Sequence, residues 1–424
     1  MSRRVKLERD ALWLGAADIA ALLVGIGVHI VLTRTFDDGD YGRWVLLLDL
    51  FYLTSTIADL GLPTLIGRDG ERLGSLTRKL VHHSLSIQVR VGIPLVVIGG
   101  LAGWLWVGEN NAWLIASFIL ALSACVQICT YAHRAALRAL GESRLEALVR
   151  FVDRGATALG VILAATMLEA SPIPLALATF LGPAGALGIA ILLGERRIRD
   201  AEPGDELPSA STDSKALVRM GLPFLAAAIA LVANVRVEKL MLGILSTPEA
   251  VEHFQIAWLA FIAGYAPILS VRAVMLSWYG EVRHDGDRLA HRHARARRVL
   301  GLCVIPGLLI GLTLGQASIR WVFPTFADEA VPLFQMMLAA WTFALMASPA
   351  LTMIQVSDAP EAYPRALWTG IIADVLACVV LIPMMGIAGA AVSAGVGGLV
   401  TWLAAERSQR AIHSSLPSPS ASIS

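Results

Sequence analysis

The sequence predicts an all-α membrane protein that crosses the bilayer many times, and three observations support this fold class. Hydrophobic residues make up 56% of the 424 residues and charged residues 16%, whereas soluble domains carry roughly 25% charged residues. Apolar segments about as long as a bilayer crossing, roughly 20 residues, recur along the chain. The alternating pattern of an outer-membrane barrel is absent, so the spanning elements must be helices. Composition thereby excludes an ordinary soluble protein.

Twelve apolar segments predict twelve transmembrane helices, separated by polar breaks of which several are very short. Gly108-Glu109-Asn110-Asn111 and Met385-Gly386 are two such breaks, and turns this short force antiparallel neighbours. The predicted helices lie near residues 11–33, 43–66, 80–107, 112–135, 146–168, 172–194, 216–244, 253–278, 297–323, 329–355, 362–383 and 386–405.

The distribution of Lys and Arg predicts that both termini are cytoplasmic. With this orientation, 25 of the 34 Lys and Arg residues fall in cytoplasmic segments, and only Arg34, Arg43 and Arg320 fall in outer loops. The other six lie within predicted helices or at their edges. Such an imbalance follows the positive-inside rule. We therefore expect a multi-pass protein of the cytoplasmic (inner) membrane.

A polar segment at residues 195–215 divides the chain into two bundles of six helices. Its middle, Pro203 to Ser211, has the composition of a flexible linker, which this orientation places in the cytoplasm. The predicted bundles cover residues 1–194 and 216–406. Residues 407–424 are predicted to form a disordered cytoplasmic tail.

A weak internal repeat supports two pseudo-symmetric halves. Leu32-Thr33 and Tyr41 in the first outer turn match Leu245-Ser246 and Phe254 in the turn after the seventh predicted helix. Both turns carry acidic residues between these points. Two parallel six-helix repeats with the substrate site between them are a known transporter plan.

The cytoplasmic segment from Glu281 to Arg298 is rich in Arg and His. Its histidines, His284, His291 and His293, allow a metal site. Its six arginines favour contact with anionic membrane lipids instead. Both interpretations stay open at this point.

No catalytic or nucleotide-binding motif accompanies the helices. Gly-x-x-x-x-Gly-Lys, His-Glu-x-x-His and the nucleophile elbow are all absent. The four cysteines, Cys125, Cys129, Cys303 and Cys378, lie within predicted helices and are interpreted as packing residues, not as metal ligands or disulfides. We therefore expect no enzyme, no metal, no nucleic-acid partner and no cofactor apart from a coupling H⁺ or Na⁺.

Four short motifs stand at the ends of predicted helices and resemble those of a known family. They are Leu32-Thr33-Arg34 with Asp40-Tyr41-Gly42; Asp59-Leu60-Gly61-Leu62 with Arg68; Pro223 with Asn234 to Lys239 and Leu242-Gly243; and Gly386 to Ala391. With them the chain resembles the polysaccharide lipid flippases of the O-antigen (Wzx) type, within the multidrug/oligosaccharidyl-lipid/polysaccharide exporter superfamily. Glu238 stands where that family usually has Asp.

The resemblance implies a V-shaped pair of six-helix bundles, similar to multidrug (MATE) exporters, that rocks between inward-open and outward-open states. The implied cargo is a polyprenyl-pyrophosphate-linked oligosaccharide, moved to the outer leaflet for surface polysaccharide synthesis, as in lipopolysaccharide O-antigen, alongside glycosyltransferases and a polysaccharide polymerase. Multidrug exporters also have twelve helices, so a cation-coupled small-molecule exporter is the main alternative. A membrane enzyme such as a glycosyltransferase is a third class, but it usually needs large polar loops.

A pyrophosphate that crosses a hydrocarbon core of ~30 Å predicts cations along an aqueous cavity, and the forked guanidinium of Arg suits phosphate. The candidate cations within predicted helices are Arg90, Arg154, Arg236, Lys239 and Arg272. Arg90 lies deep in its predicted helix, so we expect it to face the cavity instead of forming an interhelical pair. Arg272 is close enough to the cytoplasmic surface to act as an anchor.

The remaining candidate cations each have a simpler interpretation. Arg236 and Lys239 share a helix face and either meet the cargo or extend to the outer interface. Arg154 shares a face with Arg150 and Asp153, and a local ion pair is the simpler interpretation there.

Four acids within predicted helices are candidates for ion coupling, because a buried carboxylate can exchange a cation as access alternates. They are Asp18, Asp59, Glu238 and Asp374. Asp18 and His29 lie on one helix face and form either a relay or a packing hydrogen bond. Asp59 either couples ions or braces its hairpin against Arg68.

Overall fold

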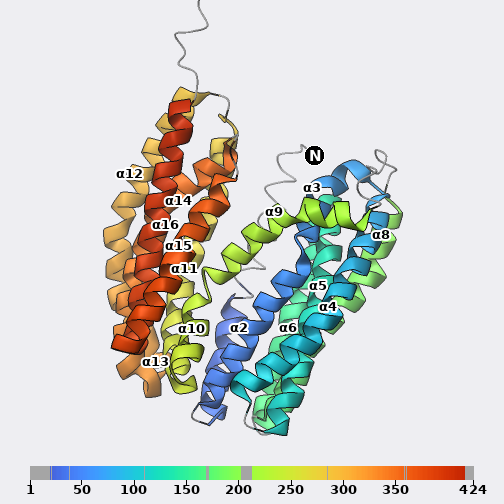
Figure 1. Ribbon diagram of the computed structural model, residues 1–424, viewed down its shortest axis with the longest axis vertical. Helices are drawn as coiled ribbons and strands as arrows, with labels where there is room; N and C mark the ends of the chain where they lie inside the picture. Colours follow the sequence, from blue (N-terminus) through green and yellow to red (C-terminus); the bar gives the residue numbers. More distant parts are fainter. Residues whose placement is uncertain are drawn as a thin grey trace, which may run out of the picture. The chain divides into compact units, whose positions relative to one another are not determined.

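The computed structural model describes Ala20, Ala359 and residues 22–37, 39–108, 110–168, 171–201, 213–283, 285–357 and 361–415, and these residues are almost entirely helical (Figure 1). They form two compact units, Met1–Val232 and Ala233–Ser424. The described parts of the twelve predicted segments are mostly helical, and two of these segments are interrupted by turns. The predicted all-α fold class is therefore confirmed.

Unit 1 contains nine helices and a π-helical turn within its described residues. They are Leu22–Thr35, α2 (Asp40–Asp59), α3 (Leu62–Leu73), α4 (Thr77–Val107), α5 (Asn111–Ala139), α6 (Ser143–Met167), α7 (Pro172–Ile189), η1 (Ala190–Gly194), α8 (Glu195–Arg199) and α9 (Ser214–Ala233). Asn110 begins α5 by accepting hydrogen bonds from the N–H groups of Ala112 and Trp113. Pro172 begins α7, where its missing N–H costs nothing.

The second predicted helix, 43–66, is broken into α2 and α3 by a bend of 46°. Leu60 and Gly61 adopt positive φ angles of 56° and 70°, and the Gly61 N–H donates to the Asp59 side chain. A Cβ on Gly61 would collide with the carbonyl oxygen of Gly221 on α9. The expectation of one continuous helix was wrong because this Asp-Leu-Gly turn lets two backbones approach closely.

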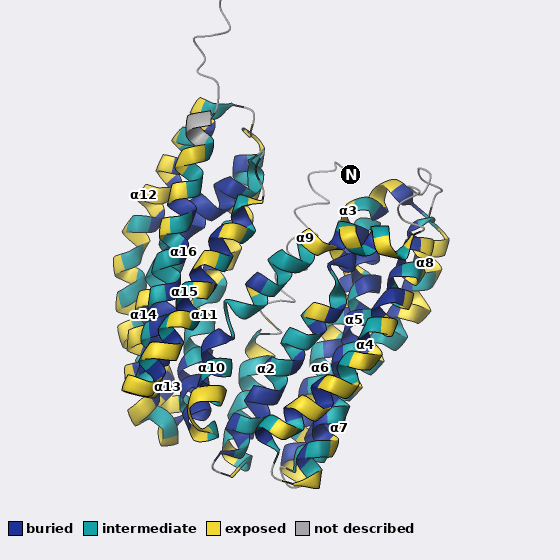
Figure 2. Cartoon of the chain, viewed as in Figure 1, coloured by how far each residue is buried: buried dark blue, intermediate teal, exposed yellow. Residues whose placement is uncertain are grey.

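The core of unit 1 lies where α3, α4, α5, α8 and α9 meet. Apolar side chains fill it, among them Leu62, Leu65, Ile66, Leu80, Val81, Ala132, Ala136, Ile198 and Leu217. Figure 2 shows the buried residues alternating along these helices with intermediate and exposed ones. Part of the predicted linker, 195–199, is therefore the helix α8, anchored by Ile198. Residues 202–212 of that linker lie outside the described residues.

Unit 2 contains α10 (Val237–Leu245), α11 (Pro248–Gly280), α12 (Gly286–Ile310), η3 (Gly311–Gly315), α13 (Gln316–Val322), η4 (Pro324–Phe326), α14 (Ala327–Val356), α15 (Ala362–Met385) and α16 (Ile387–Ser415). Glycines allow α15 and α16 to pack closely. Gly370 lies against Thr401, and Gly397 lies against Asp374. Residues 407–415, predicted as the start of a disordered tail, continue α16 because Glu406, Arg407 and Arg410 favour helix once the apolar part ends.

The seventh predicted helix, 216–244, is also broken. Residues 234–236 form a turn between α9 and α10, and Arg236, directly before α10, has a non-helical φ of −135°. The boundary between the two compact units falls here, at Val232, and not within 195–215. Interrupted helices of this kind are typical of the sites at which membrane transporters bind ions or substrates.

Among the described residues, nine helices are long and apolar enough to span a membrane, or ten when α2 and α3 count as one bent span. Two further predicted spans fail this test for local reasons. Helix Leu22–Thr35 is short within the described residues, and α6 carries charges at Glu146, Arg150, Asp153 and Arg154. A count of twelve is consistent with these elements.

Candidate functional site

Unit 1 holds a group of charged residues on α5 and α6, which we call the arginine cluster. It consists of Arg134, Arg138, Arg150, Arg154, Glu146 and Asp153, with the phenols Tyr52 and Tyr131 beside it. The two helices are joined by a tight turn in which Gly141 has a φ of 75°. Arg134 and Arg138 are four residues apart and lie on one face of α5. Glu146, Arg150 and Arg154 follow one another at intervals of four residues and lie on one face of α6.

Glu146 lies at the centre of the cluster, with a side chain that is 0% exposed. Its carboxylate accepts two hydrogen bonds from Arg138, the longer being 3.0 Å to Nε. Arg134 and Arg150 each place an Nη2 atom 3.6 Å from the same carboxylate. One buried carboxylate is therefore shared by three guanidinium groups.

Arg154 is the deepest cation of the cluster. It lies eleven residues after the start of α6, which corresponds to about 16 Å along the helix. Its Nη1 donates to the Tyr52 hydroxyl at 2.8 Å, and the nearest carboxylate, Asp153, is 4.0 Å away. The side chain remains 37% exposed. This charge is thus only weakly neutralised.

The cluster carries more positive than negative charge. Even without Arg150, the cluster contains three guanidinium groups and only the two carboxylates of Glu146 and Asp153. The buried Nε of Arg134 also has no hydrogen-bond acceptor among the described residues. Burying unbalanced charge is costly, so this arrangement suits a bound anion that supplies the missing acceptors.

Sequence reasoning found part of this site and missed part of it. It identified Arg154 together with Arg150 and Asp153, and the expected ion pair of Asp153 with Arg154 is present. It ended the predicted helix at residue 135, which left Arg138 outside, whereas α5 continues to Ala139. The spacing of Arg134, Arg138 and Glu146 on either side of one short turn is the sequence feature that could have indicated this cluster.

Unit 2 holds a pair of buried acids, Glu238 on α10 and Asp374 on α15, which are 6% and 5% exposed. Their carboxyl groups are in hydrogen-bonding contact. Cys378 places its Sγ 3.6 Å from Asp374 Oδ1, and Ser393 lies 2.9 Å from that sulfur. Two buried carboxylates in contact repel each other, so the pair is stable only with a shared proton or a bound cation. The sequence analysis identified both acids as candidates but did not predict that they are in contact.

Lys239 is buried inside unit 2 and does not reach its surface. The side chain is 2% exposed. Its Nζ donates to Gln255 at 3.0 Å and lies 4.1 Å from the centre of the Trp258 ring. Arg236 is half-buried at the break before α10. Because Arg236 lies in the break and Lys239 lies in α10, the two residues do not share one helix face as the sequence predicted.

Arg90 and Arg272 occupy different environments. Arg90 is exposed on α4 and makes no hydrogen bond or ion pair with any other described residue. It lies about 25 Å from Val107, the end of α4 that is predicted to face outwards, so it is nearer the predicted cytoplasmic boundary of a ~30 Å core than the sequence indicated. Arg272 donates to the Tyr363 hydroxyl at 3.0 Å, and no carboxylate of the described chain pairs with it.

The structure places the other predicted acids in structural contacts or leaves them undescribed. Asp18 lies outside the described residues, and His29, its predicted relay partner, contacts the Tyr41 hydroxyl at 2.9 Å. Asp59 accepts from Gly61 at the bend between α2 and α3. The predicted brace between Asp59 and Arg68 is absent, because Arg68 pairs with its neighbour Asp69 at 2.8 Å.

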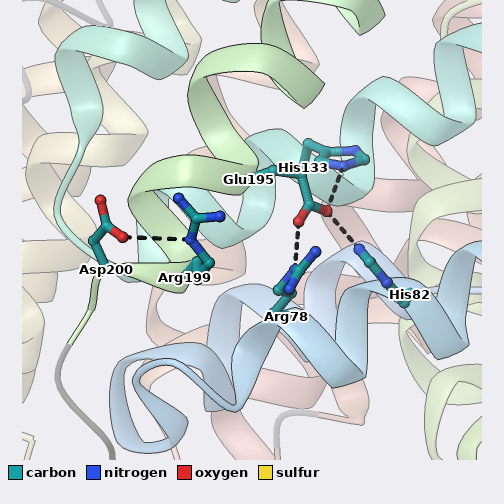
Figure 3. Close-up of polar contacts among 6 residues, drawn as sticks. All are labelled: Arg78, His82, His133, Glu195, Arg199 and Asp200. Carbon is teal, nitrogen blue, oxygen red and sulfur yellow. Dashed lines mark hydrogen bonds and ion pairs between the residues drawn. The ribbon is translucent and has the colours of Figure 1, made fainter.

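A further polar group at the predicted cytoplasmic end of unit 1 holds α8 in place (Figure 3). The Glu195 carboxylate lies 2.7 Å from the Nε of Arg78 and 2.6 Å from the Nε2 of His82, both on α4. The Nε2 of buried His133, on α5, lies 3.5 Å from the same carboxylate. Figure 3 shows these three side chains converging on the one carboxylate. The group explains the docking of α8 against α4 and α5.

No group of three or more His, Cys, Asp or Glu residues in the described ranges is arranged to hold a metal ion. In the segment 281–298, His291 is exposed on α12, whereas His293 is buried on the opposite face beside Tyr279. His284 lies outside the described residues. The two described histidines therefore cannot bind one ion together.

Comparisons with known proteins identify the fold. No family model and no curated protein matches the sequence. The inward-facing structure of a multidrug resistance MATE family transporter of the MOP superfamily matches with a TM-score of 0.72 and 14% identity, over 96% of this chain and 94% of that one. The lipid II flippase MurJ in an inward closed conformation matches with a TM-score of 0.72 and 12% identity, over 94% and 87%.

A MOP superfamily transporter from Pyrococcus furiosus matches with a TM-score of 0.69 and 15% identity, over 96% of this chain and 95% of that one. The chain therefore has the fold shared by MATE transporters and a lipid flippase.

Proposed function

We propose that this chain is a flippase that moves a polyprenyl-pyrophosphate-linked oligosaccharide from the cytoplasmic to the outer leaflet of the cytoplasmic membrane. The arginine cluster of unit 1 carries this proposal. Its surplus positive charge matches an anionic headgroup, as does the Nε of Arg134, which has no acceptor within the described part of the chain. In surface polysaccharide synthesis, glycosyltransferases would supply this substrate, and a polymerase would use the product.

The order of the charges along α6 suggests how the headgroup enters. Glu146, Arg150 and Arg154 lie about 5, 10 and 16 Å from the helix start. Arg138, 54% exposed at the end of α5, is the first cation that a headgroup arriving from the cytoplasm would meet. Arg154 is the cation farthest along this path. Each guanidinium can donate two parallel hydrogen bonds to a phosphate, which replaces part of the water that the phosphate loses.

The acid pair of unit 2 supports coupling to a cation. Glu238 and Asp374 can share one proton, and loss of that proton would leave two adjacent buried negative charges. Binding and release of H⁺ or Na⁺ there would favour different conformations of α10 and α15. The membrane potential would supply about 2.3 kcal/mol per charge per 100 mV to such a step.

The alternative is a cation-coupled exporter of small molecules. The structural neighbours include transporters of both kinds, so the fold does not choose between them. A cationic drug would be repelled by Arg138 and Arg154, whereas a diphosphate would be attracted. The charge of the cluster therefore favours the flippase.

Reconstituted vesicles provide the test. A fluorescent polyprenyl-diphosphate sugar is placed in the donor leaflet, and its appearance in the other leaflet is measured for the unchanged protein, Arg154→Gln and the control Arg199→Gln. Arg199, the last residue of α8, is 63% exposed and pairs with the next residue, Asp200. We expect Arg154→Gln to lower the rate at least tenfold and the control to leave it within twofold. Transport of a cationic dye without transport of the lipid would support the exporter instead.

A further inference from the structure

The uncovered face of α12 changes from charged to apolar along its length. One stripe, at helical spacing, contains His291, Arg295, Arg298, Leu302, Ile305 and Leu309, all exposed. The opposite stripe, Leu289, His293, Ala296 and Leu300, is buried in unit 2. Leu302, Ile305 and Leu309 are 77%, 68% and 58% exposed. Such a change on one face marks a boundary between water and hydrocarbon.

The length of the apolar part fixes where this boundary lies. From Leu302 to Val322, the end of α13, the chain advances twenty residues, or about 30 Å. This equals the thickness of a bilayer core. Trp321, 85% exposed, lies at the outer end, where Trp is common in membrane proteins. The cytoplasmic edge of the core therefore lies near Leu302, and Arg298, about 6 Å before it, lies at headgroup depth.

Arg298, and Arg295 about one turn before it, lack the acidic partners that their neighbours have. Arg288 pairs with Asp285 at 3.1 Å, Arg292 with Glu281 at 3.0 Å, and Arg297 with Glu406 at 3.8 Å. Within the described ranges, no carboxylate lies within ion-pairing distance of Arg295 or Arg298. These two arginines are three residues apart, so their guanidinium groups can reach one ligand.

We propose that Arg295 and Arg298 bind the headgroup of an anionic glycerophospholipid of the cytoplasmic leaflet. The two guanidinium groups face the lipid phosphate, and the acyl chains lie along Leu302, Ile305 and Leu309. The site thus matches both ends of one lipid molecule. This lipid stays beside unit 2 and is distinct from the transported cargo, so the proposal does not depend on the function proposed above.

The full-length protein in an uncharged detergent allows a direct test. Its midpoint of thermal unfolding is followed while phosphatidylglycerol or phosphatidylcholine is added, and the concentration of half-maximal stabilisation gives an apparent affinity. We expect phosphatidylglycerol to stabilise more strongly. The double substitution Arg295→Gln/Arg298→Gln should weaken its apparent affinity about 30-fold. That factor corresponds to about 1 kcal/mol for each cation at a membrane surface, with 1.4 kcal/mol per tenfold.

Matched variants separate a local site from general charge. Arg283→Gln/Arg288→Gln removes the same charge from the same end of unit 2, farther from the boundary, and should change the affinity less than threefold. Arg295→Lys/Arg298→Lys keeps the charge and should retain most of the binding, also if the Gln variant folds poorly. Equal losses in both Gln doubles, no preference for phosphatidylglycerol, or an equal shift with inorganic phosphate would each overturn the proposal.

Discussion

Substitution of Glu146 by Gln removes the charge at the centre of the arginine cluster while keeping the size and shape of the side chain. The carboxylate is fully buried and faces Arg134, Arg138 and Arg150. Removing one partner from a buried ion pair typically costs about 3–5 kcal/mol, because the remaining charges stay buried without compensation. For a unit of this size, about 2–4 °C per kcal/mol predicts a fall in unfolding temperature of roughly 6–20 °C.

The assay is thermal unfolding in detergent, with Glu142→Gln as the control. Glu142 lies one turn earlier, only partly buried, and forms no ion pair with any other described residue, so its loss should cost less than about 1 kcal/mol. Inorganic pyrophosphate should stabilise Glu146→Gln more than the unchanged protein, because more positive charge is then uncompensated. An unfolding temperature for Glu146→Gln within a degree of the control's would refute the role given to this carboxylate.

Three further predictions concern other parts of the chain. Gly221→Ala should destabilise unit 1 by at least ~1 kcal/mol in thermal unfolding, because a Cβ there collides with the Leu60 carbonyl oxygen; unchanged stability would mean that α9 can shift freely. Glu195→Gln should cost about 1 kcal/mol, since its partners Arg78 and His82 are half-exposed, and hydrogen exchange should increase in α8; unaltered exchange would contradict the anchoring. Asp374→Asn should abolish the dependence of transport on an imposed pH or sodium gradient in vesicles, and retained dependence would exclude the acid pair from coupling.

The two units carry related arginine contacts, which extends the weak repeat seen in the sequence. In unit 1, Arg154 of the fifth predicted span donates to Tyr52 of the second. In unit 2, Arg272 of the eighth span donates to Tyr363 of the eleventh. A six-helix repeat relates these pairs of helices, with the arginine and the tyrosine exchanged. In both contacts the arginine donates to a phenol hydroxyl group and not to a carboxylate.

Two predicted helices are interrupted by turns that apolar periodicity cannot detect. The bend at Leu60-Gly61 and the break at residues 234–236 both interrupt stretches that are apolar on either side. Hydropathy depends on average composition over about a bilayer crossing, whereas a break depends on the φ angles of two or three residues. The Asp-Leu-Gly motif was visible in the sequence, but its packing against Gly221 depends on a residue far along the chain.

The sequence by itself determined the all-helical membrane class, the position of most apolar helices, the expected orientation and most of the charges within helices. These features follow from composition and from the cost of placing polar groups in hydrocarbon. Only the tertiary structure decided which of those charges meet. It joined Glu146 to three arginines across α5 and α6, brought Glu238 to Asp374, and left Arg90 exposed on α4. Side-chain partners on different helices depend on how those helices rotate and pack, and this information is spread over contacts that are distant in the chain.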